Sequence, residues 1–344
     1  MMHMTSLEKM PTDSQSIDPH LDDTQLADTL GTYLANALTE TSRVIYGQQE
    51  EIKQIIASVL SGGHALLVGA PGLGKTKLVS TLATVMGLSA KRVQFTPDLM
   101  PADITGSEIL DEDTEGKRSF RFIPGPVFCQ LLMADEINRA SPRTQSALLQ
   151  AMQEKYISIA GKDYPLPAPF HVLATQNPIE QEGTYPLPEA QLDRFLVQVN
   201  LTYPDLATEK AMLLATTGAD EIQAQQIITS EILIKTQALI RRLPIGENLV
   251  DSILNLIRNA RPETSKDPFI QQNIAWGPGS RAAQALMLLV RARALLNGRL
   301  APNQEDLIAL APAVLRHRIA LTFAARAENI QLDDIIQNLL QKAV

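Results

Sequence analysis

The sequence predicts an α/β fold in which helices cover both faces of a parallel sheet, followed by a smaller, all-helical domain. Between residues 65 and 199, short apolar runs alternate with helical stretches, which is typical of parallel strands joined by helices. A glycine-rich loop follows the first apolar run and precedes a helix. After Pro204 the strand pattern fades and apolar residues recur at helical spacing.

The elements are expected in the following order. Residues 1–24 are polar and acidic and predict a flexible tail. Leucines at every fourth position predict a helix over Leu26–Thr41, and a second helix is expected over Gln48–Leu60. We assign residues 25–203 to the α/β domain and residues 204–344 to the helical domain. The expected strands of the sheet are Ala65–Val68, Arg92–Phe95, Gln130–Ala134, His171–Thr175 and Phe195–Val199.

Further helices are expected near Lys75–Met86 and Arg143–Gln153, and two segments look like inserted hairpins. In the first hairpin, two short strands flank the polar stretch Asp111–Lys117. The predicted hairpins pair Ser107–Leu110 with Ser119–Ile123, and Tyr156–Ile159 with Tyr164–Leu166.

Composition excludes several classes of function. The 344 residues are 45% hydrophobic and 20% charged, as in soluble globular proteins, and the net charge is −8. This charge argues against broad nucleic-acid binding, which needs clustered Lys and Arg, although a local basic groove remains compatible. The single cysteine, Cys129, allows no intramolecular disulfide, and no histidine has metal-ligand spacing. No apolar run is long enough to span a membrane and no signal peptide is recognisable, so we expect a cytoplasmic protein.

The glycine-rich loop fits the phosphate-binding pattern G-x-x-x-x-G-K-[ST]. Lys75 is expected to reach the β- and γ-phosphates of a nucleotide, and the Thr76 hydroxyl to hold Mg²⁺. A glycine-rich turn with an exposed lysine is the alternative, but the preceding strand and the following helix favour phosphate binding. The predicted nucleotide-binding residues here are Ala70, Pro71, Gly72, Leu73, Gly74, Lys75, Thr76 and Lys77.

An acidic pair, Asp135 and Glu136, ends the third predicted strand. At the carboxyl end of a buried parallel strand, Asp135 can bind Mg²⁺ through water and Glu136 can orient or deprotonate an attacking water. The alternative is a solvated acid pair at a helix start, which the phosphate loop upstream disfavours.

Each of three further polar residues allows a functional and a purely structural interpretation. Asn177 ends the next strand, where it could position water or simply form a turn before proline. Arg194 could stabilise the transferring phosphoryl group, including that of a neighbouring molecule, or pair with Asp193 or Glu189. Arg281 opens a helix in the second domain, where it could reach the nucleotide or stay exposed.

Three longer segments resemble the MoxR family of AAA+ ATPases, and the resemblance extends over about residues 40–344. The segments are Gln94–Gly106, Ala134–Ala140 and Thr175–Phe195. The resemblance implies a P-loop NTPase sheet of the AAA+ type with a helical lid, and it implies ATP or ADP with Mg²⁺ as ligands.

The resemblance also implies roles for single residues. Lys75 and Thr76 match Walker A, Asp135 and Glu136 match Walker B, and Asn177 matches sensor 1. These assignments agree with the chemistry expected from the residues themselves.

Residues outside the central motifs are assigned by resemblance alone. Arg194 matches the arginine finger, which completes the site of the neighbouring subunit. Arg281 matches sensor 2, in cis or in trans, although Ser280 stands where the family commonly has proline. Ile45, Tyr46 and Gly47 match the segment that lines the adenine pocket. The two hairpins match inserts that face the pore or top of the ring.

The expected function is Mg²⁺-dependent ATP hydrolysis by a homo-oligomeric, hexameric ring. The family association implies chaperone-like remodelling, maturation or activation of client proteins, with von Willebrand factor A domain proteins as candidates. Two alternatives are a nucleic-acid motor or ATP-dependent transcription regulator, which the negative net charge disfavours, and a nucleotide-sensing scaffold with little turnover, which Glu136 disfavours.

Overall fold

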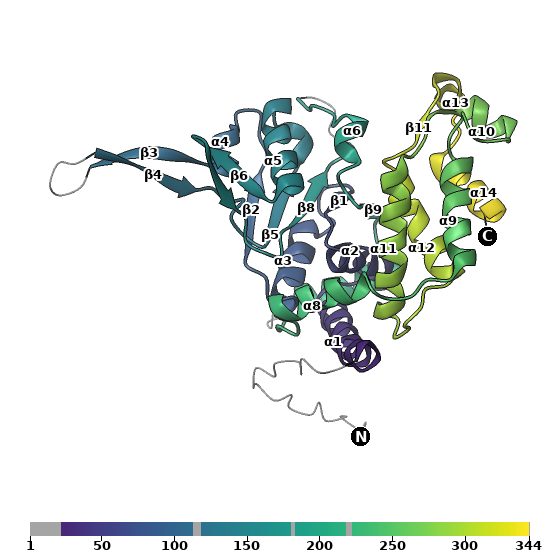
Figure 1. Ribbon diagram of the computed structural model, residues 1–344, viewed down its shortest axis with the longest axis horizontal. Coiled ribbons are helices and arrows are strands. Elements are labelled where there is room, and N and C mark those ends of the chain that lie inside the picture. The colour runs from purple at the N-terminus through teal and green to yellow at the C-terminus, as the bar shows by residue number, and fades with distance from the viewer. Residues whose placement is uncertain (1–21, 113–117, 180–182, 218–221, 344) are drawn as a thin grey trace.

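The computed structural model describes residues 22–112, 118–179, 183–217 and 222–343 (Figure 1). Most of the predicted tail, and residues 113–117 of the first hairpin's polar stretch, lie outside these residues. Helix α1 (Asp23–Val44) begins where the tail was expected to end, with Asp22 as its N-cap. The Asp22 carboxylate accepts a hydrogen bond from the backbone N–H of Gln25, which satisfies one of the free donors of the first turn.

The predicted parallel sheet is present, with its strands in the order β2-β5-β8-β1-β9. Because all five strands are parallel, their carboxyl ends meet at one edge, where ligands bind in folds of this kind. The strands are β1 (Ala65–Val68), β2 (Ala90–Gln94), β5 (Leu131–Asp135), β8 (His171–Gln176) and β9 (Val197–Asn200).

Alternate residues of the strands enter two separate hydrophobic cores, as the pleat requires. Leu67 of β1 packs in the core formed with α1, α2 (Gln49–Leu60) and α3 (Lys75–Val85), whereas Leu66 faces the core formed with α5 (Pro142–Glu154). Helices therefore cover both faces of the sheet, as predicted.

Both expected hairpins form. The first, β3 (Gly106–Glu112) with β4 (Arg118–Pro124), follows α4 (Pro101–Thr105) and projects from the body as an arm (Figure 1). The second joins β6 (Tyr156–Ile159) to β7 (Lys162–Pro165).

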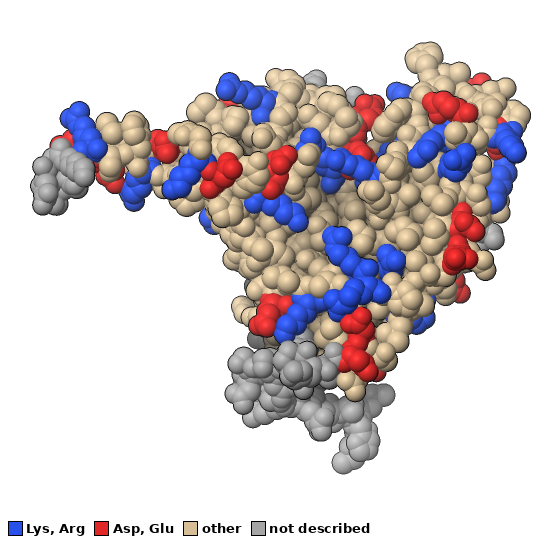
Figure 2. All heavy atoms as spheres, viewed as in Figure 1, with Lys and Arg blue, Asp and Glu red and all other residues tan. Residues whose placement is uncertain are grey.

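The arm of β3 and β4 carries both charged and apolar side chains on its surface. Side chains of both signs are interspersed along it (Figure 2), including the Arg121–Asp111 ion pair at 2.8 Å. Leu110 and Phe120 face each other across the strands and stay exposed.

The second part of the chain is a helical lid, as predicted, and it also contains a short antiparallel pair of strands, β10 (Ile274–Trp276) and β11 (Ala320–Leu321), that helical spacing did not reveal. Its helices are α7 (Leu206–Thr216), α8 (Ser230–Ile240), α9 (Glu247–Asn259), α10 (Pro268–Asn273), α11 (Ser280–Leu296), α12 (Gln304–Leu315), α13 (Phe323–Ala327) and α14 (Leu332–Ala343).

Helix α11 packs against α2, and α12 packs against β9, so the lid helices share one continuous hydrophobic core with one face of the sheet. Within the described residues, no helix has the length and apolar character needed to cross a membrane.

Candidate functional site

The predicted phosphate loop connects β1 to α3 at the carboxyl edge of the sheet. Gly72 and Gly74 adopt φ values of +83° and +71°, a region that favours glycine, although open space surrounds the position of an added Cβ at both. Gly74 is the N-cap of α3 and offers no side chain to its first turn, so the N–H groups there are left for an anion.

Lys75 and Thr76 occupy the first turn of α3. The Lys75 Nζ donates a hydrogen bond to the carbonyl oxygen of Gly69 at 2.6 Å, so the ammonium group lies over the loop. Thr76 and the adjacent Lys77 are exposed. The loop therefore presents backbone donors, an ammonium group and a hydroxyl on one surface.

The predicted adenine segment, Ile45–Gly47, joins α1 to α2 and lies against both the loop and the lid. The Nε2 of Gln48 donates to the carbonyl oxygen of Leu73 at 3.3 Å. A Cβ at Gly47 would stand 2.4 Å from the Cγ2 of Thr208 in α7, so the lid approaches the segment closely. The structure brings this segment beside the phosphate loop.

Asp135 ends β5 and is almost buried. Its Oδ1 accepts a hydrogen bond from the Thr175 hydroxyl on β8 at 2.5 Å, and its Oδ2 accepts from Nη2 and Nε of Arg92 on β2, at 2.5 and 3.1 Å. Arg92 and Thr175 were not predicted from the sequence, since only the strand order brings them to Asp135.

Glu136 adopts a left-handed backbone conformation with φ 55° and ψ 51°, which a non-glycine residue rarely takes. Its N–H donates to the Thr175 hydroxyl at 2.8 Å, and its Oε2 accepts from Gln94 at 2.8 Å and from Arg139 at 3.1 Å. The hydroxyl of Thr175 thus joins both acids of the pair, and Gln94 is another residue that the sequence did not reveal.

Asn177 directly follows β8, which lies between β5 and β1, so it stands between the acidic pair and the phosphate loop. The side chain is buried, and its Oδ1 accepts from the N–H of Ile179 at 3.1 Å. Its Nδ2 is buried and has no hydrogen-bond partner among the residues that the structure describes. A buried amide donor of this kind fits an incoming oxygen, because leaving it unpaired costs free energy.

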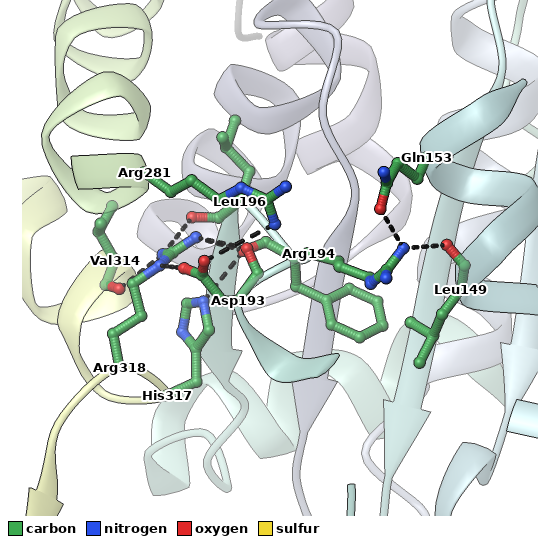
Figure 3. Close-up of polar contacts among 10 residues, drawn as sticks. Leu149, Gln153, Asp193, Arg194, Leu196, Arg281, Val314, His317 and Arg318 are labelled. Atoms are coloured by element: carbon green, nitrogen blue, oxygen red, sulfur yellow. Dashed lines mark hydrogen bonds and ion pairs between the residues drawn. The ribbon is translucent and has the colours of Figure 1, made fainter. Parts of the chain in front are cut away.

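Arg194 follows α6 (Glu189–Leu192), and its guanidinium group lies on α5 of the same chain (Figure 3). Its Nη1 donates to the carbonyl oxygen of Leu149 at 3.0 Å and to Oε1 of Gln153. Its buried Nε has no hydrogen-bond partner in the described part of the chain. Within the described residues, these side-chain contacts lie on α5 and not on the acidic pair or the phosphate loop.

Arg281 is the second residue of α11, and its side chain is about half exposed. Its Nη1 lies 3.8 Å from Oδ2 of Asp193, the residue before Arg194. The other carboxylate oxygen of Asp193 accepts from Arg318 of the lid at 2.7 Å. Asp193 thus links the candidate sensor 2 to a lid arginine that the sequence did not single out.

The residues fit a nucleotide with Mg²⁺. Hard oxygen donors, the Asp135 carboxylate and the Thr76 hydroxyl, suit this ion, which takes further ligands from water and phosphate. In the described part of the chain, no cluster of three or more His, Cys, Asp or Glu residues forms a separate metal site.

A phosphate loop between strand and helix, an acidic pair on the same edge of a parallel sheet, and a helical lid together define a P-loop ATPase of the AAA class. Residues 64–197 match the model of the ATPase family associated with various cellular activities, and residues 269–339 match that of the AAA lid domain.

Individual relatives narrow the class to a family. The chain is 41% identical to the chaperone MoxR1 of Mycobacterium tuberculosis, covering 90% of this chain and 81% of the relative. It is 38% identical to the protein YeaC of Bacillus subtilis, covering 89% and 93%. A crystal structure of a Cytophaga hutchinsonii protein has a TM-score of 0.85 at 38% identity, covering 92% and 96%. The chain belongs to the MoxR family of AAA ATPases.

Proposed function

We propose that this protein hydrolyses ATP in a Mg²⁺-dependent reaction. The observation that carries the proposal is that the phosphate loop after β1 and the acidic pair at the end of β5, Asp135 and the next residue Glu136, lie at the same edge of one sheet. Thr76 and Asp135 would hold the metal, which supplies neutralisation of the phosphate oxygens. Lys75 would bind the β- and γ-phosphates and stabilise charge that develops on them.

The remaining residues of the site would act on the attacking water. Glu136 orients the water and accepts its proton, and the unpaired Nδ2 of Asn177 donates a hydrogen bond to the water or to a γ-phosphate oxygen. For this, Glu136 must exchange its contacts with Gln94 and Arg139 for the water.

The proposed active form is a homo-hexameric ring in which Arg194 completes the site of the adjacent subunit. This is supported by the contacts of Arg194, whose side chain is directed to α5 rather than to the nucleotide loop of its own chain. The work of the ring would be chaperone-like remodelling, maturation or activation of client proteins in the cytoplasm, with von Willebrand factor A domain proteins as candidate partners. One relative is named a chaperone.

The test is the ATPase rate as a function of protein concentration, with light scattering for mass, for wild type, Glu136→Gln and Arg194→Ala. The rate per subunit should rise with assembly, and both variants should bind ATP but turn it over at least about 100-fold more slowly. A rate independent of assembly, with Arg194→Ala unaffected, would refute the shared site. Negligible turnover by the assembled wild type would instead favour a nucleotide-sensing scaffold.

A further inference from the structure

Arg318 joins the lid to the segment that contains Arg194. It follows α12 and is one of the largest fully buried side chains, with 2% of its surface exposed. Its guanidinium donates to Oδ1 of Asp193 and to the carbonyl oxygens of Phe195 and Val314, each at 2.7 Å. Longer bonds, at 3.1 and 3.3 Å, reach the carbonyl oxygens of Leu196 and Asp193 (Figure 3).

This arrangement requires arginine specifically. Burial of the guanidinium lowers the pKa of Arg318, and the hydrogen bond that it donates to the Asp193 carboxylate opposes that shift. The planar group offers five donors in a fixed fork, whereas a lysine ammonium is a single point with three. Four of the five bonds end on residues 193–196, so the lid holds the backbone of this segment as well as one side chain.

Arg194 lies inside this segment, and its side chain extends to the opposite side, onto α5 (Figure 3). The lid also contributes His317, whose ring lies 3.0 Å from the carbonyl oxygen of Phe195, and Arg281, which approaches Asp193. The position of Arg194 is therefore set by α5 through its side chain and by the lid through its backbone.

We propose that Asp193 and Arg318 are positioning residues that couple the lid to the arginine finger. A lid that changes its angle on the sheet would move residues 193–196 with it, and so move Arg194 relative to the adjacent subunit. The inference rests on the proposed function, in which Arg194 serves that subunit. It adds a route by which nucleotide bound beneath the lid of one subunit controls hydrolysis in the next.

The first test is a double-variant cycle in the assembled full-length chain with Asp193→Asn, Arg194→Ala and both together. Asp193→Asn should lower kcat about tenfold or more, which is the effect of one lost charge-assisted hydrogen bond, while KM for ATP changes less than about twofold. Since Asp193 acts through Arg194, the double variant should be no slower than Arg194→Ala alone. Effects that multiply would overturn the proposal.

The matched control is Asp333→Asn, which removes a carboxylate 2.8 Å from Arg316 at the same end of α12, but within the lid. It should keep wild-type kcat. Thermal unfolding of each variant shows whether a lower kcat comes from a damaged fold or from a mispositioned Arg194. Arg318→Lys keeps the positive charge but loses the planar, five-donor guanidinium, so it should lower kcat in the same way as Asp193→Asn.

A second test mixes Asp193→Asn subunits with Glu136→Gln subunits. Sites built from the Glu136 of the first and the Arg194 of the second are complete, so activity should recover above either variant alone. Absence of recovery, with Arg194→Ala and Glu136→Gln recovering normally, would place the defect in the variant's own site and overturn the proposal. If Arg194→Ala itself retains full activity, the proposed trans finger fails instead.

Discussion

The hydroxyl of Thr175 allows a direct test of the site, because this one atom is hydrogen-bonded to both Asp135 and Glu136. It donates to Asp135 at 2.5 Å and accepts the N–H of Glu136 at 2.8 Å. Thr175→Val keeps the shape of the side chain and removes both bonds. It leaves the left-handed backbone of Glu136 without this support.

The expected magnitude follows from these two bonds. A hydrogen bond to a charged group contributes about 1.5–3 kcal/mol, and an unpaired buried N–H costs about 1–3 kcal/mol. Because Asp135 keeps its two bonds from Arg92, we expect the lower part of the summed range, a loss of about 2.5–4 kcal/mol in the free energy of unfolding. Misplacement of Glu136 should lower kcat by about 10–100-fold.

Urea denaturation and steady-state ATPase assays measure the two effects, with nucleotide binding expected to persist because the phosphate loop is unchanged. Thr175→Ser is the matched control, since it keeps the hydroxyl and should retain most of the activity and stability. If Thr175→Val is as stable and as active as the wild type, the bridging role of the hydroxyl is wrong.

Three further predictions concern charge and burial. Arg92→Gln removes a cation that competes for the carboxylate of Asp135, so half-maximal ATPase activity should need about tenfold less Mg²⁺; an unchanged requirement would contradict this. Burial lowers the pKa of His171 to about 4 and of His64 to about 3, below the unfolded value of about 6.5, so the unfolded state binds protons more readily. The stabilising contribution of these neutral histidines is complete above about pH 6.5 and declines as the pH falls toward 4. At pH 5 the free energy of unfolding should be about 2 kcal/mol lower because of His171 alone. Urea denaturation at pH 7.5 and pH 5 measures this difference, and equal stabilities would refute the prediction. Burial raises the pKa of Cys129 to about 11, so a thiol reagent should modify the native chain at least about 100-fold more slowly than the urea-unfolded chain.

Local pattern was enough to predict the sheet, both hairpins and the strand–loop–helix around Lys75. Each of these features depends on residues within one or two elements, where the spacing of apolar residues and the positions of glycines predict the local structure. The three segments that resemble the MoxR family likewise predicted the AAA fold, which the structure has.

Contacts between distant elements were not predictable in this way. Arg92 and Gln94 reach the acidic pair only because β2 pairs with β5, and strand order does not follow from hydrophobic pattern. The bond between Arg318 and Asp193 joins residues 125 positions apart. A buried arginine looks the same in sequence as an exposed one, since only the fold supplies its acceptors.

The strand order also has a consequence for synthesis of the protein on the ribosome. The phosphate loop emerges early, but among the described strands its preceding strand, β1, pairs with β8 and β9. In these pairings Ala65 lies beside Leu173 and Val197. At roughly 5–20 residues per second, these strands follow β1 after about 5 to 25 seconds. Until β8 has been made, β1 has neither of these partner strands, so we expect nucleotide to assist folding of the nascent chain only after β8 has been synthesised.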